Sequence, residues 1–145
     1  MKETLHYLLM SVHLSFQKKL LSSIKKTDLT PGQPKIIDYL TYHDGAVQKE
    51  IADACHIEPA TITSVLLGME KNGLIIRKNL NGNRRNLYVY LTDKGKNASK
   101  QVAEYFDMIE KTALNGFNAD EREMLISLLT RMNNNINIKE VIDNE

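Results

Sequence analysis

Apolar residues at helical spacing dominate the first part of the chain and predict two helices there. Positions three or four apart lie on one face of a helix. A second helix is expected after Thr30, a suitable N-cap, because Pro31 and Pro34 fit a first helical turn. We expect Gly45 to end this second helix. The first helix covers residues 3 to about 26, and its apolar face consists of Leu5, Leu8, Leu9, Val12, Phe16, Leu20 and Ile24.

Two short helices separated by a tight turn are predicted next. The first covers about 47–54, and the residues "CHIE" interrupt it before Pro59 opens the second, at a position where proline is tolerated. Asn72 and Gly73 form a pair suited to a left-handed helix end. The apolar stripe of the second helix consists of Ile62, Val65, Leu66 and Met69. This arrangement is typical of a helix-turn-helix.

The pattern then changes to the alternation of a β-hairpin. Leu87, Val89 and Leu91 fall on one face of a strand, and "GLIIRKNL" at 73–80 is its expected partner, rich in β-branched and apolar residues. Residues 81–85 between them are turn-forming and include two arginines. The helices and the hairpin together predict a winged helix-turn-helix, a mainly α fold with a small β-wing.

Two further helices complete the predicted fold. One begins near Asp93, and the other begins after Asn118, its expected N-cap. The run "NNNIN" is expected to loosen the end of the last helix. The apolar stripe of that helix consists of Met124, Leu125, Leu128, Leu129 and Met132. The first and last helices carry more apolar surface than a small winged helix covers, which predicts an interface.

The net charge of +1 hides a segregation of charge along the chain. Residues 46–100 carry nine Lys/Arg against five Asp/Glu, whereas residues 101–145 carry four against nine. The basic excess in the middle indicates an anionic partner for that segment. The single cysteine, the lack of a signal-like start and the lack of a membrane-spanning apolar run predict a cytoplasmic protein.

Three motifs occur in order along the chain: "LTPGQ", then "QKEIADACHIEPATITSVLLGMEKNGLIIR", then "NRRNLYVYLTDKG". In this order they resemble the MarR family of winged-helix transcription regulators over essentially the whole chain. The resemblance implies a homodimer, with an N-terminal dimerisation helix at 1–30, a winged helix-turn-helix at 31–92 and C-terminal dimerisation helices at 93–145. It also implies a repressor that binds a pseudo-palindromic operator in double-stranded DNA and is released by a small-molecule effector or by oxidation. The sequence does not identify the effector.

The predicted DNA contacts follow from the helix-turn-helix and the wing. The second helix of the motif would lie in the major groove, and the wing would place arginine in the minor groove. Arginines are common in the family where this chain has Ser64 and Gly68, and Asn83 replaces the aspartate that pairs with the wing arginine, Arg85. Because these arginines are missing, we expect an A·T-rich operator, with Leu67 meeting a thymine methyl. The full set of candidates is Thr61, Thr63, Ser64 and Lys71 in the helix, Asn83, Arg84 and Arg85 in the wing, and Lys49, Arg77 and Lys78 for phosphates.

Other kinds of chemistry find no pattern in the sequence. Neither a phosphate-binding loop, nor a nucleophile motif, nor metal-ligand spacing is present, so we expect no enzyme, no cofactor and no metal. Cys55 is interpreted as a small buried residue. Phe16, Tyr39, Tyr42 and Tyr105 are interpreted as core, with a ligand cavity as the alternative. The alternative function is a winged-helix protein-interaction module without operator binding, since two family arginines are missing.

Overall fold

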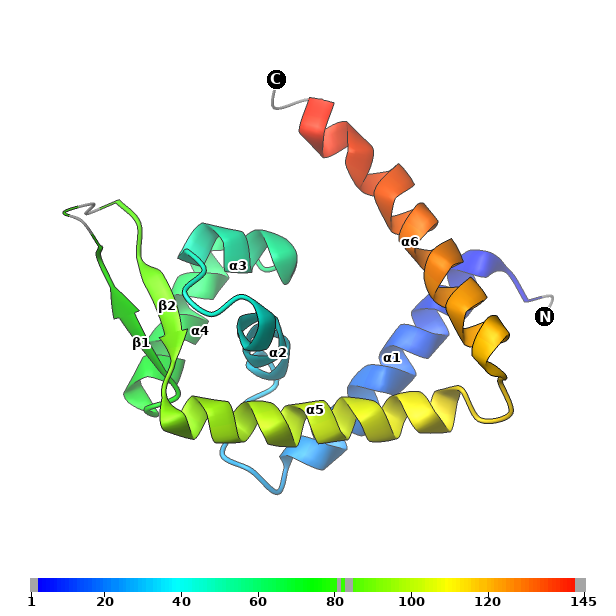
Figure 1. Cartoon of the computed structure of the whole chain (residues 1–145), viewed down its shortest axis with the longest axis horizontal. Helices are drawn as coiled ribbons and strands as arrows, with labels where there is room; N and C mark the ends of the chain where they lie inside the picture. Colours follow the sequence, from blue (N-terminus) through cyan, green and yellow to red (C-terminus); the bar gives the residue numbers. More distant parts are fainter. Residues whose placement is uncertain (1–2, 81, 83–84, 143–145) are drawn as a thin grey trace. The chain divides into compact units, whose positions relative to one another are not determined.

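The computed structural model describes residues 3–80, 82 and 85–142, with residues 138–142 described by their backbone only. The chain forms two compact units, residues 1–109 and residues 110–145. The elements, shown in Figure 1, are α1 (Leu5–Ile24), α2 (Pro34–Tyr42), α3 (Gln48–Ala54), α4 (Pro59–Lys71), β1 (Ile75–Lys78), β2 (Tyr88–Leu91), α5 (Asp93–Ala113) and α6 (Ala119–Ile142). The predicted fold class, a mainly α winged helix-turn-helix, is confirmed.

The core of the first unit is built where α2, α3, α4 and the hairpin meet, a region that we call the lobe (residues 34–91). Helix α2 packs against α3 and β2, and α4 packs against α3 and β1. Complete burial of one aliphatic side chain in this core stabilises the fold by about 1.5–3 kcal/mol. The largest fully buried aliphatic side chains of the lobe are Ile36, Ile37, Leu40, Ile51, Leu66, Met69, Ile75 and Val89.

The start of α2 differs from the prediction. The N-cap position is Gln33 rather than Thr30, and Pro34 is the first helical residue. The Thr30 N–H donates to Gln33 Oε1 at 3.2 Å, and the Gln33 N–H donates to the Thr30 carbonyl at 3.1 Å. These bonds close a turn before the helix begins, so Thr30 belongs to that turn. Gln33 is only 3% exposed, and its buried Oε1 is satisfied by the Thr30 N–H.

The turn between α3 and α4 depends on a left-handed residue. His56 has φ of 53°, a conformation uncommon outside glycine. The turn is held by the Ile57 N–H, which donates to the Ala52 carbonyl at 2.9 Å. Helix α4 then begins at Pro59, as predicted, and ends with Asn72 as C-cap and Gly73 at φ of 75°.

The wing is an antiparallel pair of four-residue strands, with Ile75 opposite Leu91 and Arg77 opposite Val89. The segment before α3 adds to its edge: the Val89 N–H donates to the Ala46 carbonyl at 3.0 Å. Val89 and Leu91 are buried, as the alternation predicts.

Helix α5 begins directly after the wing. Thr92 Oγ1 accepts the Gly95 N–H at 3.0 Å and donates to the Gly73 carbonyl at 2.5 Å. A β-carbon at Gly95 would collide with the Leu74 carbonyl oxygen, so only glycine permits this approach.

In the second unit, α6 begins with the predicted cap. Asn118 Oδ1 accepts the Glu121 N–H at 2.8 Å, and Glu121 Oε1 accepts the Asn118 N–H at 3.0 Å, a capping box. The expected loosening at "NNNIN" is wrong, because the helix continues through it to Ile142. Asn137 Nδ2 donates to the Asn133 carbonyl at 2.8 Å, so the side chain bonds one turn back within the helix.

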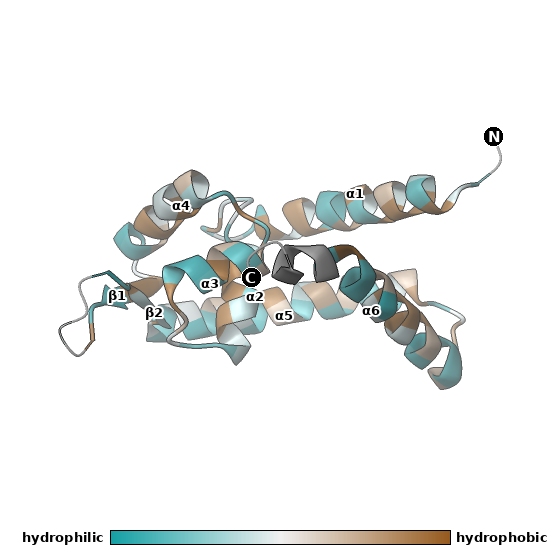
Figure 2. Ribbon diagram, turned by 90° about the horizontal axis from the view of Figure 1, so that it is seen from above, coloured by the Kyte–Doolittle hydropathy of each residue, from teal (hydrophilic) through white to brown (hydrophobic). Residues whose placement is uncertain are grey.

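The apolar surface predicted at both ends of the chain is exposed. On α1, Leu5 is 64% and Val12 is 54% exposed, and on α6, Met124 is 60% and Ile136 is 74% exposed. Figure 2 shows apolar residues interspersed with polar ones along both helices. Each helix therefore presents apolar side chains to solvent within this single chain.

Candidate nucleic-acid interface

Helix α4 has one buried side and one exposed side, as its apolar stripe predicts. Ile62, Leu66 and Met69 are at most 2% exposed, whereas Val65 is half-buried. Leu67 is 42% exposed, so the side chain expected to meet a thymine methyl is accessible. The other predicted contact residues of this helix are also exposed: Thr61, Thr63, Ser64 and Lys71.

The three hydroxyl groups of α4 are not equivalent. Thr63 Oγ1 donates to the Pro59 carbonyl at 3.2 Å and accepts from Gln48 Nε2 at 2.9 Å. The hydroxyl groups of Thr61 and Ser64 make no hydrogen bond to the part of the chain that the structure describes. The hydroxyls of Thr61 and Ser64 are therefore available to an outside partner, whereas that of Thr63 is engaged.

Arg77, predicted to contact phosphate, lies in an ion pair within the lobe. Its Nε donates to Glu70 Oε2 at 3.1 Å and its Nη2 donates to Glu70 Oε1 at 3.4 Å, a bidentate arrangement. Its Nη1 donates to Gln48 Oε1 at 3.4 Å, and its side chain is only 13% exposed. The hydrogen bond from Arg77 lowers the pKa of Glu70. The guanidinium thus joins β1 to α4 and α3.

Sequence reasoning missed Gln48 and Glu70 as partners of this network. The available signal was the seven-residue separation of Glu70 and Arg77 across the turn from α4 to β1. Opposite charges on two elements joined by a short turn are within reach of each other. Gln48 carried no such signal, because it is 29 residues from Arg77.

The predicted lysines lie at the surface of the lobe. Lys49, Lys71 and Lys78 are exposed, and Lys78 Nζ lies 5.1 Å from the centre of the Tyr90 ring. A cation over an aromatic face is attracted by the ring, which orients this side chain. Lys94 Nζ donates to the Asn72 carbonyl at 2.7 Å and so satisfies the end of α4.

The wing tip is described in part. Arg85 is exposed, on the β2 side of the hairpin. Asn83 and Arg84, both predicted to act in the wing, lie outside the described residues.

The aromatic residues are less uniformly core than predicted. Tyr39 and Tyr105 are half-buried against the core, but Tyr42, the last residue of α2, is 79% exposed. Tyr39 stacks on His43 with ring centres 4.3 Å apart. These side chains border a surface hollow of about 360 Å³ lined by Lys35, Asp38, Tyr39, Tyr42, His43, Ala54 and Cys55.

Cys55 is half-buried rather than fully buried as predicted, because it lies at the edge of the core, at the end of α3. Its Sγ lies 3.6 Å from the Lys35 carbonyl oxygen, and burial raises the pKa of its thiol. A raised thiol pKa reduces the reactive thiolate.

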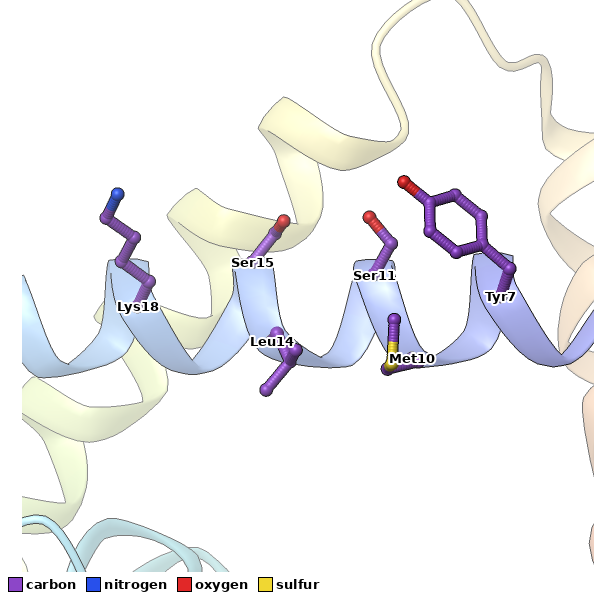
Figure 3. A pocket seen from close by; sticks show the side chains of 6 residues that line it. All are labelled: Tyr7, Met10, Ser11, Leu14, Ser15 and Lys18. Carbon is purple, nitrogen blue, oxygen red and sulfur yellow. The ribbon is translucent and has the colours of Figure 1, made fainter. Parts of the chain in front are cut away.

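A second hollow, of about 210 Å³, runs along α1. It is lined by Tyr7, Met10, Ser11, Leu14, Ser15 and Lys18, and Figure 3 shows these side chains along successive turns of that one helix. All six lining residues belong to α1, so this hollow is a feature of the helix face.

Residues 29–87 match the family model described as MarR family. Over this segment the chain resembles the MarR family. The regulator YdgJ of Bacillus subtilis, an HTH-type transcriptional regulator, is 28% identical over 111 residues, which are 77% of this chain and 68% of YdgJ.

Solved structures of the family have the same fold. A MarR-family regulator from Listeria monocytogenes, complexed with 26mer DNA, has a TM-score of 0.86 at 24% identity and covers 97% of this chain and 96% of its own. The Staphylococcus aureus MepR–DNA complex has a TM-score of 0.81 at 26% identity, over 93% of this chain and 99% of that one. The family is one of transcription regulators rather than enzymes.

Two features that other functions would need are absent from the described residues. Within the described ranges, no helix is long and apolar enough to span a membrane. Over the same residues, no group of three or more His, Cys, Asp and Glu side chains is arranged to hold a metal ion.

Proposed function

We propose that this protein is a cytoplasmic homodimeric repressor of the MarR type that binds double-stranded DNA at a pseudo-palindromic operator. The observation that carries the proposal is the exposed side of α4. Thr61, Ser64, Leu67 and Lys71 face outward from a helix whose other side is anchored in the lobe core. This is the geometry of a recognition helix, which places donors, acceptors and apolar groups against base edges.

The surrounding charges support DNA as the partner. Lys49 on α3 and Lys71 on α4 are exposed, and they would contact phosphates and contribute sequence-independent affinity. Arg85, with Arg84, would enter the adjacent minor groove from the wing. Arg77 has a different role in the proposal, because its guanidinium is engaged by Glu70. The DNA complexes of the Listeria monocytogenes and Staphylococcus aureus neighbours also favour this partner.

The dimer would form through the helices that leave apolar side chains exposed. We assign residues 1–30 and 93–145 to dimerisation and residues 31–92 to DNA binding. A palindromic operator follows from two-fold symmetry, because each protomer brings one recognition helix to one half-site. Repression and release by a small effector complete the proposal, with the effector unidentified.

The test is a selection of duplexes from a random-sequence pool by the full-length protein, followed by anisotropy titration at two salt concentrations. We expect enrichment of a palindromic, A·T-rich site, preferred over scrambled DNA, with affinity that falls steeply as salt rises. Equal, weak binding to selected and scrambled duplexes would contradict operator binding. It would favour the protein-interaction module instead.

A further inference from the structure

The engaged hydroxyl of Thr63 has a consequence for which bases α4 reads. A threonine hydroxyl has one proton and two lone pairs. The Thr63 proton is donated to the Pro59 carbonyl at 3.2 Å, and one lone pair accepts from Gln48 Nε2 at 2.9 Å. Thr63 therefore has no proton to donate to an acceptor on a base edge.

The orientation of Gln48 is itself determined by its second partner. Gln48 Oε1 accepts from Arg77 Nη1 at 3.4 Å, so the amide NH₂ is turned toward Thr63. Arg77 is in turn oriented by its bidentate pairing with Glu70. Donors and acceptors alternate from Glu70 to Pro59, so each group is satisfied by the next. The network spans β1, α3 and α4, which orients Thr63 from three elements.

With its oxygen bonded inside the lobe, exposed Thr63 offers its γ-methyl to a partner. Leu67 lies one turn further along α4 and is 42% exposed. Residues four apart are neighbours on a helix surface, about 5–6 Å between β-carbons. The two side chains therefore form one apolar strip on the recognition face. In the major groove, only thymine presents a methyl group to such a strip.

We propose that Thr63 is a specificity-determining residue that reads a thymine through its γ-methyl, with Gln48 as the positioning residue. The proposal rests on the proposed operator binding and deepens it. Thr61 and Ser64, whose hydroxyls have no partner in the described chain, take the hydrogen-bonding contacts.

The test uses the selected duplex and a set of duplexes in which each thymine in turn is replaced by deoxyuridine, which removes only the methyl. For the wild-type protein, we expect one position per half-site at which the replacement weakens binding about fourfold, the effect of one buried methyl. Thr63→Ser keeps the hydroxyl and removes the methyl, so its affinity should become indifferent to uracil at that position. Thr63→Val keeps the methyl and removes the hydroxyl, so it should retain the thymine preference.

Thr61→Val is the matched control. It removes a hydroxyl that is not engaged within the described chain, so overall affinity should fall while the thymine preference at the Thr63 position stays. Thr63 and Thr61 are both exposed, and equal thermal midpoints for all variants would show that the fold is unchanged.

Three results would overturn the inference. If Thr63→Ser still prefers thymine at that position, another residue contacts the methyl group. Loss of the preference in Leu67→Ala would then identify Leu67 as that residue. A large loss of affinity and preference in Thr63→Val would show that the second lone pair accepts from a base. If no duplex is enriched in the selection, the proposed function itself fails, and this reading of Thr63 fails with it.

Discussion

The lobe and the helices at the two ends of the chain treat apolar residues in opposite ways. In the lobe, Ile36, Leu40 and Leu66 are completely buried. On α6, no side chain between residues 119 and 137 is buried, and Met124 is 60% exposed. The apolar stripes look alike in the sequence, but the lobe covers its own stripes whereas α6 does not. The lobe is a finished core, and we propose that the exposed apolar side chains of the terminal helices form an interface with a second protomer.

The largest expected effect comes from substitutions in the exposed apolar stripe of α6. Met124→Glu combined with Leu128→Glu places two charges on the exposed apolar stripe of α6. We expect a monomer, and a loss of about 10²–10⁴-fold in operator affinity, because two linked half-sites become independent. Sedimentation and anisotropy measure the two effects. Asn134→Glu, on the opposite side of the helix, is the control; a double variant that stays dimeric would refute our assignment of α6.

The next effect tests how tightly the lobe and the start of α5 pack. Gly95→Ala puts a methyl against the Leu74 carbonyl, and we expect a destabilisation of about 3 kcal/mol because backbone cannot yield as a side chain does. Gly68→Ala is the matched control: nothing lies within 4 Å of its β-carbon position, so better helix propensity should stabilise by about 1 kcal/mol. Urea unfolding at one protein concentration measures both. Equal effects would mean that the close approach at Gly95 does not matter.

A smaller effect separates DNA binding from association. Arg85→Ala should weaken operator binding about tenfold and reduce the salt slope by about one, as expected for one lost arginine contact. The dimer should be unaffected, since the wing is remote in sequence from the exposed stripes of α1 and α6. Anisotropy at several salt concentrations, with sedimentation on the same samples, gives both values. An unchanged salt slope would remove Arg85 from the interface.

The smallest effect concerns the Glu70–Arg77 pair. The pKa of Glu70 is lowered in the folded lobe, so its contribution to stability is fully present above the ordinary value of 4.5. It is lost as the pH falls through the lower folded-state pKa, where the carboxylate protonates. Glu70→Gln should therefore be less stable than wild type at pH 7 by up to about 1 kcal/mol, with the difference vanishing in acid. The urea midpoints of unfolding of both proteins, measured from pH 7 into acid, give this difference in stability. Glu50→Gln controls for the change in net charge. A difference that persists in acid would point to lost packing instead.

Much of the fold could be predicted because the signals are local. Pro59 at the start of α4 and Asn118 at the start of α6 act through their own backbone and their nearest neighbours. The predictions that failed involve competition between local groups. Thr30 is a good N-cap by type, but Gln33 closes a turn with it first. The asparagine run near residue 135 favours loops by composition, yet Asn137 bonds one turn back and the helix continues.

The candidate site divides in the same way. The exposed side of α4 follows from its periodicity, because a stripe that is buried defines the side that is not. Whether each polar group on that side is available to bind DNA does not follow from the periodicity. Arg77 was expected to bind phosphate because it is an arginine in a basic segment. Glu70 lies only seven residues away, but nothing near Arg77 in sequence indicated that Gln48 would also engage it.

The sequence by itself determined the element order, the helix-turn-helix with its wing, and the apolar faces, because each depends on spacing within a few residues. Tertiary structure alone decided which polar groups Gln48 engages. Gln48 meets Thr63 across 15 residues and Arg77 across 29, and only the packing of α3 against α4 and the wing brings them within hydrogen-bonding distance. A hydrogen bond forms by proximity in space, and that proximity is set by the fold as a whole.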